Sequence, residues 1–214
     1  MLLVAKAEPA LSAYSHLRGA DRLGRLVGPR HVGDVDLLAS AGRPWGADND
    51  CFQGLDADAY GKMVERLPKG GLFVTVPDVV GDHRATVRLW HRWAEKVRAA
   101  GHVPAFVLQD GCDRFGQVPA GAGALFVGGS TPYKLSSTAA ALVREGRKRG
   151  MWVHMGRVSS RRRIMHAQSV GVDSIDSSAF ALWADRDLPW ALSMLAAEAS
   201  QMNFGALLHE HERV

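Results

Sequence analysis

Cysteine is scarce in this 214-residue sequence, which contains only Cys51 and Cys112. Two cysteines argue against a disulfide framework, and they cannot supply the three or four thiolates of a structural zinc site. We expect both thiols to be reduced and Cys51 to be a packing residue. His209 and His211 are expected to be exposed near the C-terminus, so the sequence predicts neither a metal site nor a cofactor.

Long apolar runs are also absent, since none approaches the roughly 18 residues that a membrane helix needs. The apolar start, residues 1–6, is too short for a secretory signal and has no basic leader. These absences predict a protein of the cytoplasm with no membrane partner. No internal repeat, linker or low-complexity stretch is present, so residues 1–214 are expected to form a single domain.

Charge is small in total but uneven in its distribution. The formal net charge is +4, yet residues 144–163 hold eight basic residues opposed only by Glu145, so this segment carries +7 and the rest of the chain −3. The basic residues are Arg144, Arg147, Lys148, Arg149, Arg157, Arg161, Arg162 and Arg163. Such a cluster is either a solvated helix face or a phosphate-binding stripe of the kind found in nucleic-acid-binding proteins.

Apolar, β-branched segments alternate with amphipathic segments along the chain. Strands are predicted at residues 2–6, 35–39, 72–76, 104–108, 124–127, 151–154 and 172–175, with an eighth around 45–49. Helices are predicted at residues 57–67, 83–100, 132–149, 160–170 and 189–208. Residues 18–33, which are rich in Gly and Arg, are expected to be irregular, and Trp90 and Trp93 are assigned to the core.

This alternation predicts an α/β fold. Because the helical segments cross over between strands, we expect a compact (β/α)₈ TIM-like barrel, smaller than the usual 250 or so residues. A doubly wound open sheet is the competing architecture. No Gly-x-Gly-x-x-Gly turn follows the first predicted strand, which disfavours the dinucleotide-binding version of that sheet.

Polar side chains stand at the ends of the predicted strands, which converge on one site in a barrel. The candidate site residues are Asp48, Phe52, Asp78, Gln109, Gly128, Gly129, Met155 and Asp176. Their rivals are Asp50 for Asp48, Asp82 for Asp78 and Asp110 for Gln109, although Asp82 is more simply a helix N-cap and Asp110 part of a turn. Asp173 is assigned a structural or solvent-facing role, and His154 is interpreted as a satisfied histidine.

Several of these residue types suit a guanine ring. Asp78 can accept hydrogen bonds from ring N1 and from the exocyclic amine, whereas Gln109 and the N–H of Gly129 can donate to O6. Glycine at this position lets the ring approach the main chain closely. Phe52 and Met155 can cover the two ring faces, because aromatic and thioether groups pack well on flat π systems.

Asp48 and Asp176 remain, and carboxylates on either side of a sugar carbon are the equipment of glycosidic-bond chemistry. The surrounding motifs resemble those of the tRNA-guanine transglycosylase superfamily, most closely its short phage and bacterial branch implicated in placing 7-deazaguanine derivatives in DNA. The resembling segments are Asp48-Asn49-Asp50-Cys51-Phe52-Gln53, Asp78, Gln109, Gly128-Gly129, His154-Met155-Gly156 and Val172-Asp173-Ser174-Ile175-Asp176.

The resemblance implies a glycosyltransferase that exchanges guanine in DNA for a 7-deazaguanine base, such as 7-cyano-7-deazaguanine. It makes Asp176 the nucleophile of a double displacement through a covalent aspartyl–sugar intermediate, and Asp48 the general acid/base. Phe52 and Met155 become the stacking groups, and Asp78, Gln109, Gly128 and Gly129 the base-binding groups. No zinc subdomain is expected, because no cysteine follows Asp176.

The basic cluster completes this expectation. Arg157, Arg161, Arg162 and Arg163 are predicted to hold phosphates that flank the target nucleotide, which would have to be flipped out of a duplex. The implied setting is a bacterium or a phage-infected bacterium. The alternatives are base exchange in tRNA, a base-excising hydrolase that uses water, and a non-catalytic nucleic-acid-binding barrel; the sequence leaves the oligomeric state open.

Overall fold

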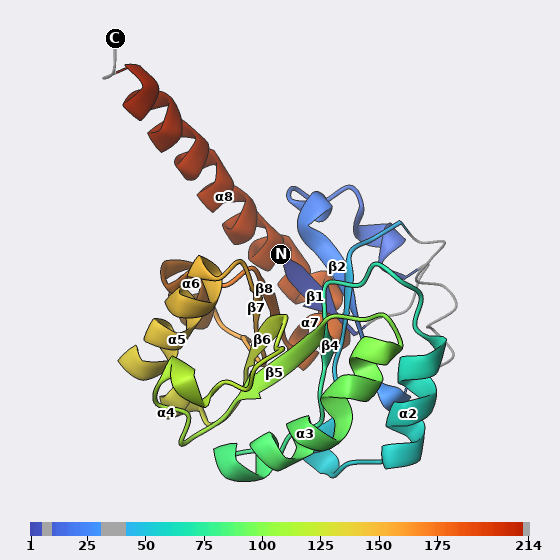
Figure 1. Cartoon of the computed structure of the whole chain (residues 1–214). Coiled ribbons are helices and arrows are strands. Elements are labelled where there is room, and N and C mark those ends of the chain that lie inside the picture. Colours follow the sequence, from blue (N-terminus) through green and yellow to red (C-terminus); the bar gives the residue numbers. More distant parts are fainter. Residues whose placement is uncertain (6–9, 31–41, 212–214) are drawn as a thin grey trace.

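The computed structural model describes residues 1–5, 10–30 and 42–211. Within these residues eight parallel strands close into a barrel in the order β1 to β8, with helices outside them (Figure 1). The strands are β1 Leu2–Val4, β2 Leu23–Val27, β3 Trp45–Ala47, β4 Val74–Thr75, β5 Pro104–Leu108, β6 Ala124–Val127, β7 Trp152–Met155 and β8 Ser174–Asp176. Pairing of β1 with β8 closes the barrel. The single-domain (β/α)₈ prediction is therefore confirmed, and the open sheet is excluded.

Helices follow most of the strands. They are α2 Ala57–Arg66, α3 His83–Ala99, α4 Thr131–Lys134, α5 Ser137–Lys148, α6 Arg161–Val170, α7 Ser178–Leu182 and α8 Ala184–His211. Side-chain caps fix several of their starts. Asp82 accepts a hydrogen bond from the N–H of Ala85 (2.9 Å) at the start of α3, as predicted, and such a cap satisfies a backbone donor that the helix leaves unpaired.

The barrel separates two apolar layers. Between strands and helices lies the larger layer, which includes Val153 and Met155 of β7. Inside the barrel lies a smaller layer, which includes Phe73, Val107 and Phe126. Successive side chains on a strand point to opposite faces, so each strand supplies both layers.

The strand β2 is the main error in the predicted elements. Residues 18–33 were expected to be irregular, yet Leu23–Val27 is buried throughout and pairs with both β1 and β3. Gly24 permits this packing, because a Cβ atom there would lie 2.6 Å from the carbonyl oxygen of Pro44. The predicted strand at residues 35–39 lies outside the described residues.

Two predicted helices have different boundaries in the structure. The helix expected at 132–149 is divided into α4 and α5, because Ser136 caps the start of α5 by accepting from the N–H of Ala139 (3.1 Å). The helix expected to start at Pro189 begins at Ala184. Asp185 and Asp187 in its first turn favour this earlier start, since acidic side chains complement the positive end of a helix dipole.

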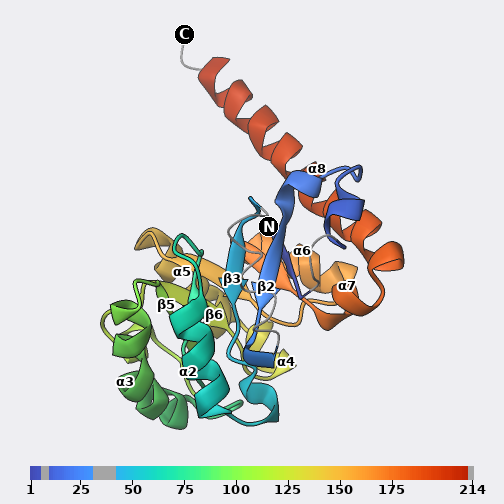
Figure 2. The same ribbon diagram turned by 90° about the vertical axis from the view of Figure 1, so that its right-hand side faces the viewer.

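Helix α8 leaves the barrel and carries the C-terminus away from it (Figures 1 and 2). Its 28 residues make it the longest helix in the described part of the chain. No helix in residues 1–5, 10–30 or 42–211 has both the length and the apolar character that crossing a membrane requires.

Candidate active site

A pocket opens at the carboxyl ends of the strands, where (β/α)₈ barrels hold their active sites. Its free volume is about 150 Å³, smaller than the roughly 300–1,000 Å³ of sites that enclose a whole drug-sized ligand. The pocket therefore suits one heterocycle of a larger substrate. It is lined by Arg30, Asp48, Asn49, Asp50, Cys51, Phe52, Thr75, Asp78, Val80, Val107, Gln109, Phe126, Gly128, Gly129, Gly156, Arg157 and Asp176.

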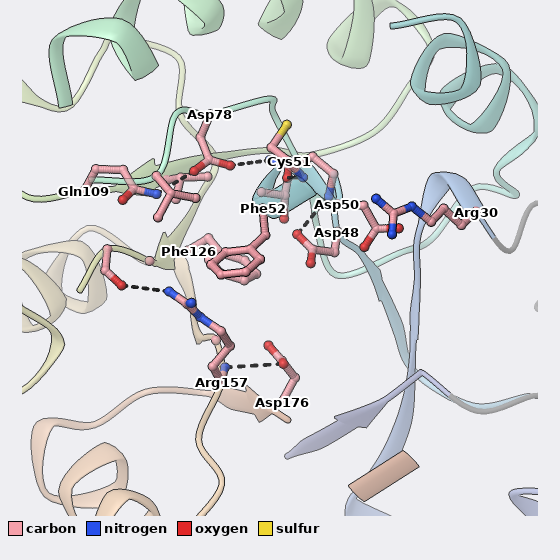
Figure 3. Close-up of a pocket in the computed structure, with 17 residues that line it drawn as sticks. Arg30, Asp48, Asp50, Cys51, Phe52, Asp78, Gln109, Phe126, Arg157 and Asp176 are labelled. Atoms are coloured by element: carbon pink, nitrogen blue, oxygen red, sulfur yellow. Dashed lines mark hydrogen bonds between the residues drawn. The ribbon is translucent and has the colours of Figure 1, made fainter. Parts of the chain in front are cut away.

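Asp48 and Asp176 point toward the same space, in front of Phe126 (Figure 3). Asp48 follows β3 and is only partly exposed. Burial, together with the nearby carboxylates of Asp176 and Asp50, raises the pKa of its carboxyl to about 8. Asp48 thus holds a proton at neutral pH and can act as an acid.

Asp176 ends β8 and has a different environment, with two hydrogen-bond partners at its carboxyl, whereas the Asp48 carboxyl accepts from the N–H of Asn49 (2.8 Å). The Oδ2 of Asp176 lies 2.8 Å from Nε2 of His154, and its Oδ1 accepts from the backbone N–H of Arg157 at 3.3 Å. Two carboxyl groups with such different surroundings are the usual basis for separate acid and nucleophile roles.

A buried polar cluster centred on Asp78 lies across the pocket. Asn49 donates to Oδ1 of Asp78 (2.8 Å) and Gln109 donates to Oδ2. Burial raises the pKa of Asp78, against the lowering effect of these two hydrogen bonds and of Arg157. Because each carboxylate oxygen has a second lone pair, Asp78 can still accept from a bound ring.

Gln109 has a different role from the predicted donation to O6. Its Oε1 accepts from the N–H of Gly81 (2.8 Å), and its Nε2 faces Asp78. With both ends of the amide engaged and the residue only 2% exposed, Gln109 orients Asp78. Thr75 also lines the pocket, and its buried hydroxyl has no partner among the described residues. It is therefore a further group to which a ligand can hydrogen-bond.

Arg157 closes one side of the pocket. Its guanidinium donates to the carbonyl oxygen of Gly129 (2.9 Å) and lies over the ring of Phe52, which is 70% exposed. Arg157 has φ 59°, and among the described residues Asp50 (φ 54°) is the other non-glycine residue with a positive φ. Both line the pocket, consistent with the tendency of backbone strain to gather at functional sites.

The two glycines after β6 keep the pocket open. A Cβ atom on Gly128 would lie 2.7 Å from a Val107 methyl and 2.9 Å from Nε2 of Gln109. Gly129 has φ 75°, and a Cβ atom there would lie 2.6 Å from the Asp110 carboxylate. A side chain at Gly128 would therefore displace groups that line the pocket, and one at Gly129 would displace the Asp110 carboxylate.

Met155 does not reach the pocket, so its predicted role as a stacking group is wrong. The alternation along β7 places its side chain in the outer layer with Val153, whereas His154 points into the barrel. The apolar wall is instead Phe126, which lines the pocket from β6 and lies 4.7 Å from His154 between ring centroids. Neighbouring residues on a strand point to opposite faces, so an assignment that is wrong by one residue places the side chain on the wrong face.

The four predicted phosphate-binding arginines are separated in space. Arg157 lines the main pocket. Arg161 lies over the ring of Trp190 on α8, with its guanidinium carbon 5.2 Å from the centroid. Arg162 and Arg163 line a separate cavity near the start of α6, and Arg163 donates to the carbonyl oxygen of Arg157 (3.4 Å).

Three rival carboxylates have structural contacts. Asp110 accepts from the N–H (2.7 Å) and hydroxyl (2.6 Å) of Ser130 and so fixes the loop after β6. Asp173 pairs with Arg147 and accepts from the N–H of Val153 (2.8 Å), in keeping with its structural assignment. Asp82 caps α3. Asp50 remains a rival of Asp48, because both line the pocket.

The sequence interpretation missed several pocket residues. They are Arg30, Asn49, Thr75, Phe126 and Gly156. Asn49 belongs to the segment Asp48-Asn49-Asp50-Cys51-Phe52-Gln53, and its place between two aspartates could have indicated a site residue. No group of three or more potential metal ligands occurs among residues 1–5, 10–30 and 42–211.

Comparisons with known proteins support the fold. No family model matches the chain, and no curated protein matches it. The chain is similar to a solved structure of 3-hexulose-6-phosphate synthase, with a TM-score of 0.50 and 17% identity over 92% of this chain and 98% of that chain. At this identity the likeness shows the fold alone.

These findings correct the activity predicted from the sequence. The solved structure named above is a synthase, not a glycosyltransferase, and neither the family models nor the curated proteins give a match that supports a transglycosylase. The prediction of a DNA guanine transglycosylase therefore does not stand. Two of its three alternatives, tRNA base exchange and a non-catalytic nucleic-acid-binding barrel, gain no support from the comparisons. The neighbour's own activity is not transferred to this chain.

Proposed function

We propose that the chain is an N-glycoside hydrolase, which uses water to cleave the bond between a sugar carbon and a purine-like base. The observation that carries this proposal is the carboxyl pair Asp48 and Asp176, which share one pocket in different environments. A proton-holding acid and a hydrogen-bonded carboxylate are the two groups that retaining glycoside hydrolases use.

The cleavage has two steps. A carboxylate oxygen of Asp176 attacks C1′ of the sugar while the C1′–N bond breaks, and the Asp48 proton passes to the departing base nitrogen. The product is a sugar ester of Asp176 and a neutral free base. Water then attacks C1′ and gives a proton to the Asp48 carboxylate, which releases Asp176 and restores both groups.

The rest of the pocket suits a planar base with hydrogen-bond donors on one edge. Asp78, held by Asn49 and Gln109, offers lone pairs to such an edge. Phe52 and Phe126 offer aromatic surfaces. Guanine and 7-deazaguanine both have this donor edge, and we propose a base of this class.

The small volume of the pocket leaves the phosphates, and the part of the sugar beyond C1′, outside. Arg162 and Arg163 line a separate cavity, and Arg163 contacts Arg157 of the pocket. We propose that these arginines hold flanking phosphates, which makes DNA and tRNA the proposed macromolecular sources of the nucleotide. We also retain the resemblance to the tRNA-guanine transglycosylase superfamily as a proposal about the plan of the base pocket. Exchange of one base for another is not part of it.

The test is release of free base. Purified protein is incubated with guanosine, deoxyguanosine, oligodeoxynucleotides and tRNA, with and without 7-deazaguanine in place of guanine, and the free bases are measured by mass spectrometry. We expect release from at least one substrate, and a loss of about 10³-fold or more in Asp176→Asn. The matched control is Asp113→Asn, an exposed aspartate in the loop after β5, which should behave as wild type. Absence of release from every substrate would contradict the proposal.

A further inference from the structure

His154 connects the candidate nucleophile to the interior of the barrel. It is fully buried, and both of its ring nitrogens lie 2.8 Å from side chains of β8: Nδ1 from Ser174 Oγ, and Nε2 from Asp176 Oδ2. The indole N–H of Trp152 donates to the same Ser174 Oγ at 2.9 Å. Residues two apart on the adjacent strands β7 and β8 thus form one chain of hydrogen bonds that ends on Asp176.

The donor and acceptor roles in this series of hydrogen bonds follow from the groups at its two ends, the Trp152 indole and the Asp176 carboxylate. Indole nitrogen can only donate, so Ser174 Oγ accepts from Trp152 and has its own proton to donate to Nδ1 of His154. The other ring nitrogen, Nε2, then carries the hydrogen and donates to the Asp176 carboxylate. The opposite neutral tautomer would set a lone pair of Nε2 against a carboxylate lone pair.

We propose that His154 is a positioning residue for Asp176, and that Ser174 and Trp152 fix the tautomer that this role requires. The inference rests on the proposed function, in which Asp176 is the nucleophile. His154 is absent from the pocket lining and is packed against Phe73 and Phe126, with ring centroids at 5.1 and 4.7 Å. It therefore acts on the substrate only through Asp176.

Within the described part of the chain, one further hydrogen bond orients the carboxylate. Its other partner, the backbone N–H of Arg157, is at 3.3 Å, near the upper limit of a useful hydrogen bond. Misplacement of a reacting group by about 1 Å can cost about 100-fold in rate. Loss of the His154 hydrogen bond should therefore lower kcat by about 10- to 100-fold and leave KM within about threefold, because the base pocket is unchanged.

A pair of substitutions separates positioning from packing. His154→Phe preserves a ring between Phe73 and Phe126 but removes the N–H. His154→Gln loses the ring but can place an amide N–H near Asp176. A positioning role predicts that Gln retains more kcat than Phe, even if it melts at a lower temperature. A packing role predicts the reverse order of kcat, and that result would overturn the inference. His91→Gln, at an exposed position on α3, is the control.

Nitrogen NMR of the His154 ring gives a readout that needs no activity. In ¹⁵N-labelled protein, Nε2 of His154 should carry the proton, and its shift should move in Asp176→Asn. An Nε2 without a proton would overturn the inference while leaving the hydrolase proposal intact. Conversely, if Nε2 carries a proton but the protein releases no base, the proposed function is wrong while the His154–Asp176 hydrogen bond is confirmed. Ser174→Ala should lower kcat about 3- to 10-fold, because it removes the hydrogen bond that fixes the His154 tautomer. An unchanged kcat would contradict this role of Ser174.

Discussion

The guanidinium carbon of Arg157 lies 5.0 Å from the centroid of the Phe52 ring. This contact joins the loop after β3 to the loop after β7 across the mouth of the pocket. Phe52 is still 70% exposed, so most of its surface remains available to a ligand. The contact also places a cation at the mouth of the pocket.

The first prediction concerns this ring. Phe52→Leu should raise KM about 10-fold with a smaller effect on kcat, because stacking of a base on an aromatic ring contributes roughly 1–3 kcal/mol. Steady-state kinetics of base release measure both constants. Phe115→Leu is the matched control, since this ring also lies under an arginine, Arg149, but outside the pocket. An unchanged KM in Phe52→Leu would exclude stacking on this residue.

The second prediction concerns the pH dependence of turnover. Since Asp48 must be protonated to assist the leaving base and its pKa is raised to about 8, kcat should fall as pH rises through about 8, tenfold per unit in the limit. Asp48→Asn should have a low kcat without this fall. Asp50→Asn should keep it, at a slightly lower pH, because one neighbouring negative charge is gone. If Asp50→Asn loses the fall instead, Asp50 is the acid.

The third prediction links the same carboxyl to stability. The folded-state pKa of Asp48 is above its ordinary value of 3.8, so between pH 4 and pH 8 the folded state binds a proton that the unfolded state lacks. This contribution to the free energy of unfolding is fully present at low pH and is lost as pH rises. Asp48→Asn should therefore become more stable than wild type by up to about 1.4 kcal/mol per pH unit over that range. Urea unfolding at four pH values tests this, and a pH-independent difference would contradict it.

The fourth prediction concerns Gly156, at the end of β7. A Cβ atom there would lie 2.7 Å from the Phe126 ring and 3.4 Å from Asp176 Oδ2. Phe126 cannot retreat easily, because it is packed against His154 and Phe73. Gly156→Ala should lower the free energy of unfolding by about 1–3 kcal/mol and also lower kcat. Gly116→Ala, where a Cβ atom would meet nothing within 4 Å, should stay within about 0.5 kcal/mol of wild type; equal effects of the two would contradict this account.

The sequence predicted the barrel because most of its strands are apolar runs bounded by glycine and helix caps. β5 and β6 were predicted at their observed bounds, Pro104–Leu108 and Ala124–Val127. β2 could not be predicted in this way, since Gly24 and Arg25 interrupt its apolar pattern and its burial comes from tertiary packing. Local propensity is a weak guide where neighbouring strands decide the conformation.

Much of the pocket was also predictable, because the carboxyl ends of barrel strands converge. Asp48, Asp78 and Asp176 line it, as the convergence implies. The stacking role predicted for Met155 was wrong because a motif gives no information about which face of β7 a residue occupies. His154 was assigned to a satisfied core role, and its two hydrogen bonds agree with this. Its link to Asp176 needed the register of β7 against β8, which the sequence does not contain.

The left-handed backbone of Asp50 and Arg157 has a consequence for engineering. Each residue holds a conformation that glycine adopts at no steric cost, and such conformations cost about 1–3 kcal/mol in other residues. Selection of random variants for heat resistance alone would thus be drawn toward glycine at both positions. The variants recovered would be more thermostable, yet they would have lost the contacts of the Arg157 guanidinium with Gly129 and Phe52. Screening for thermal tolerance in this scaffold needs a simultaneous screen for catalysis.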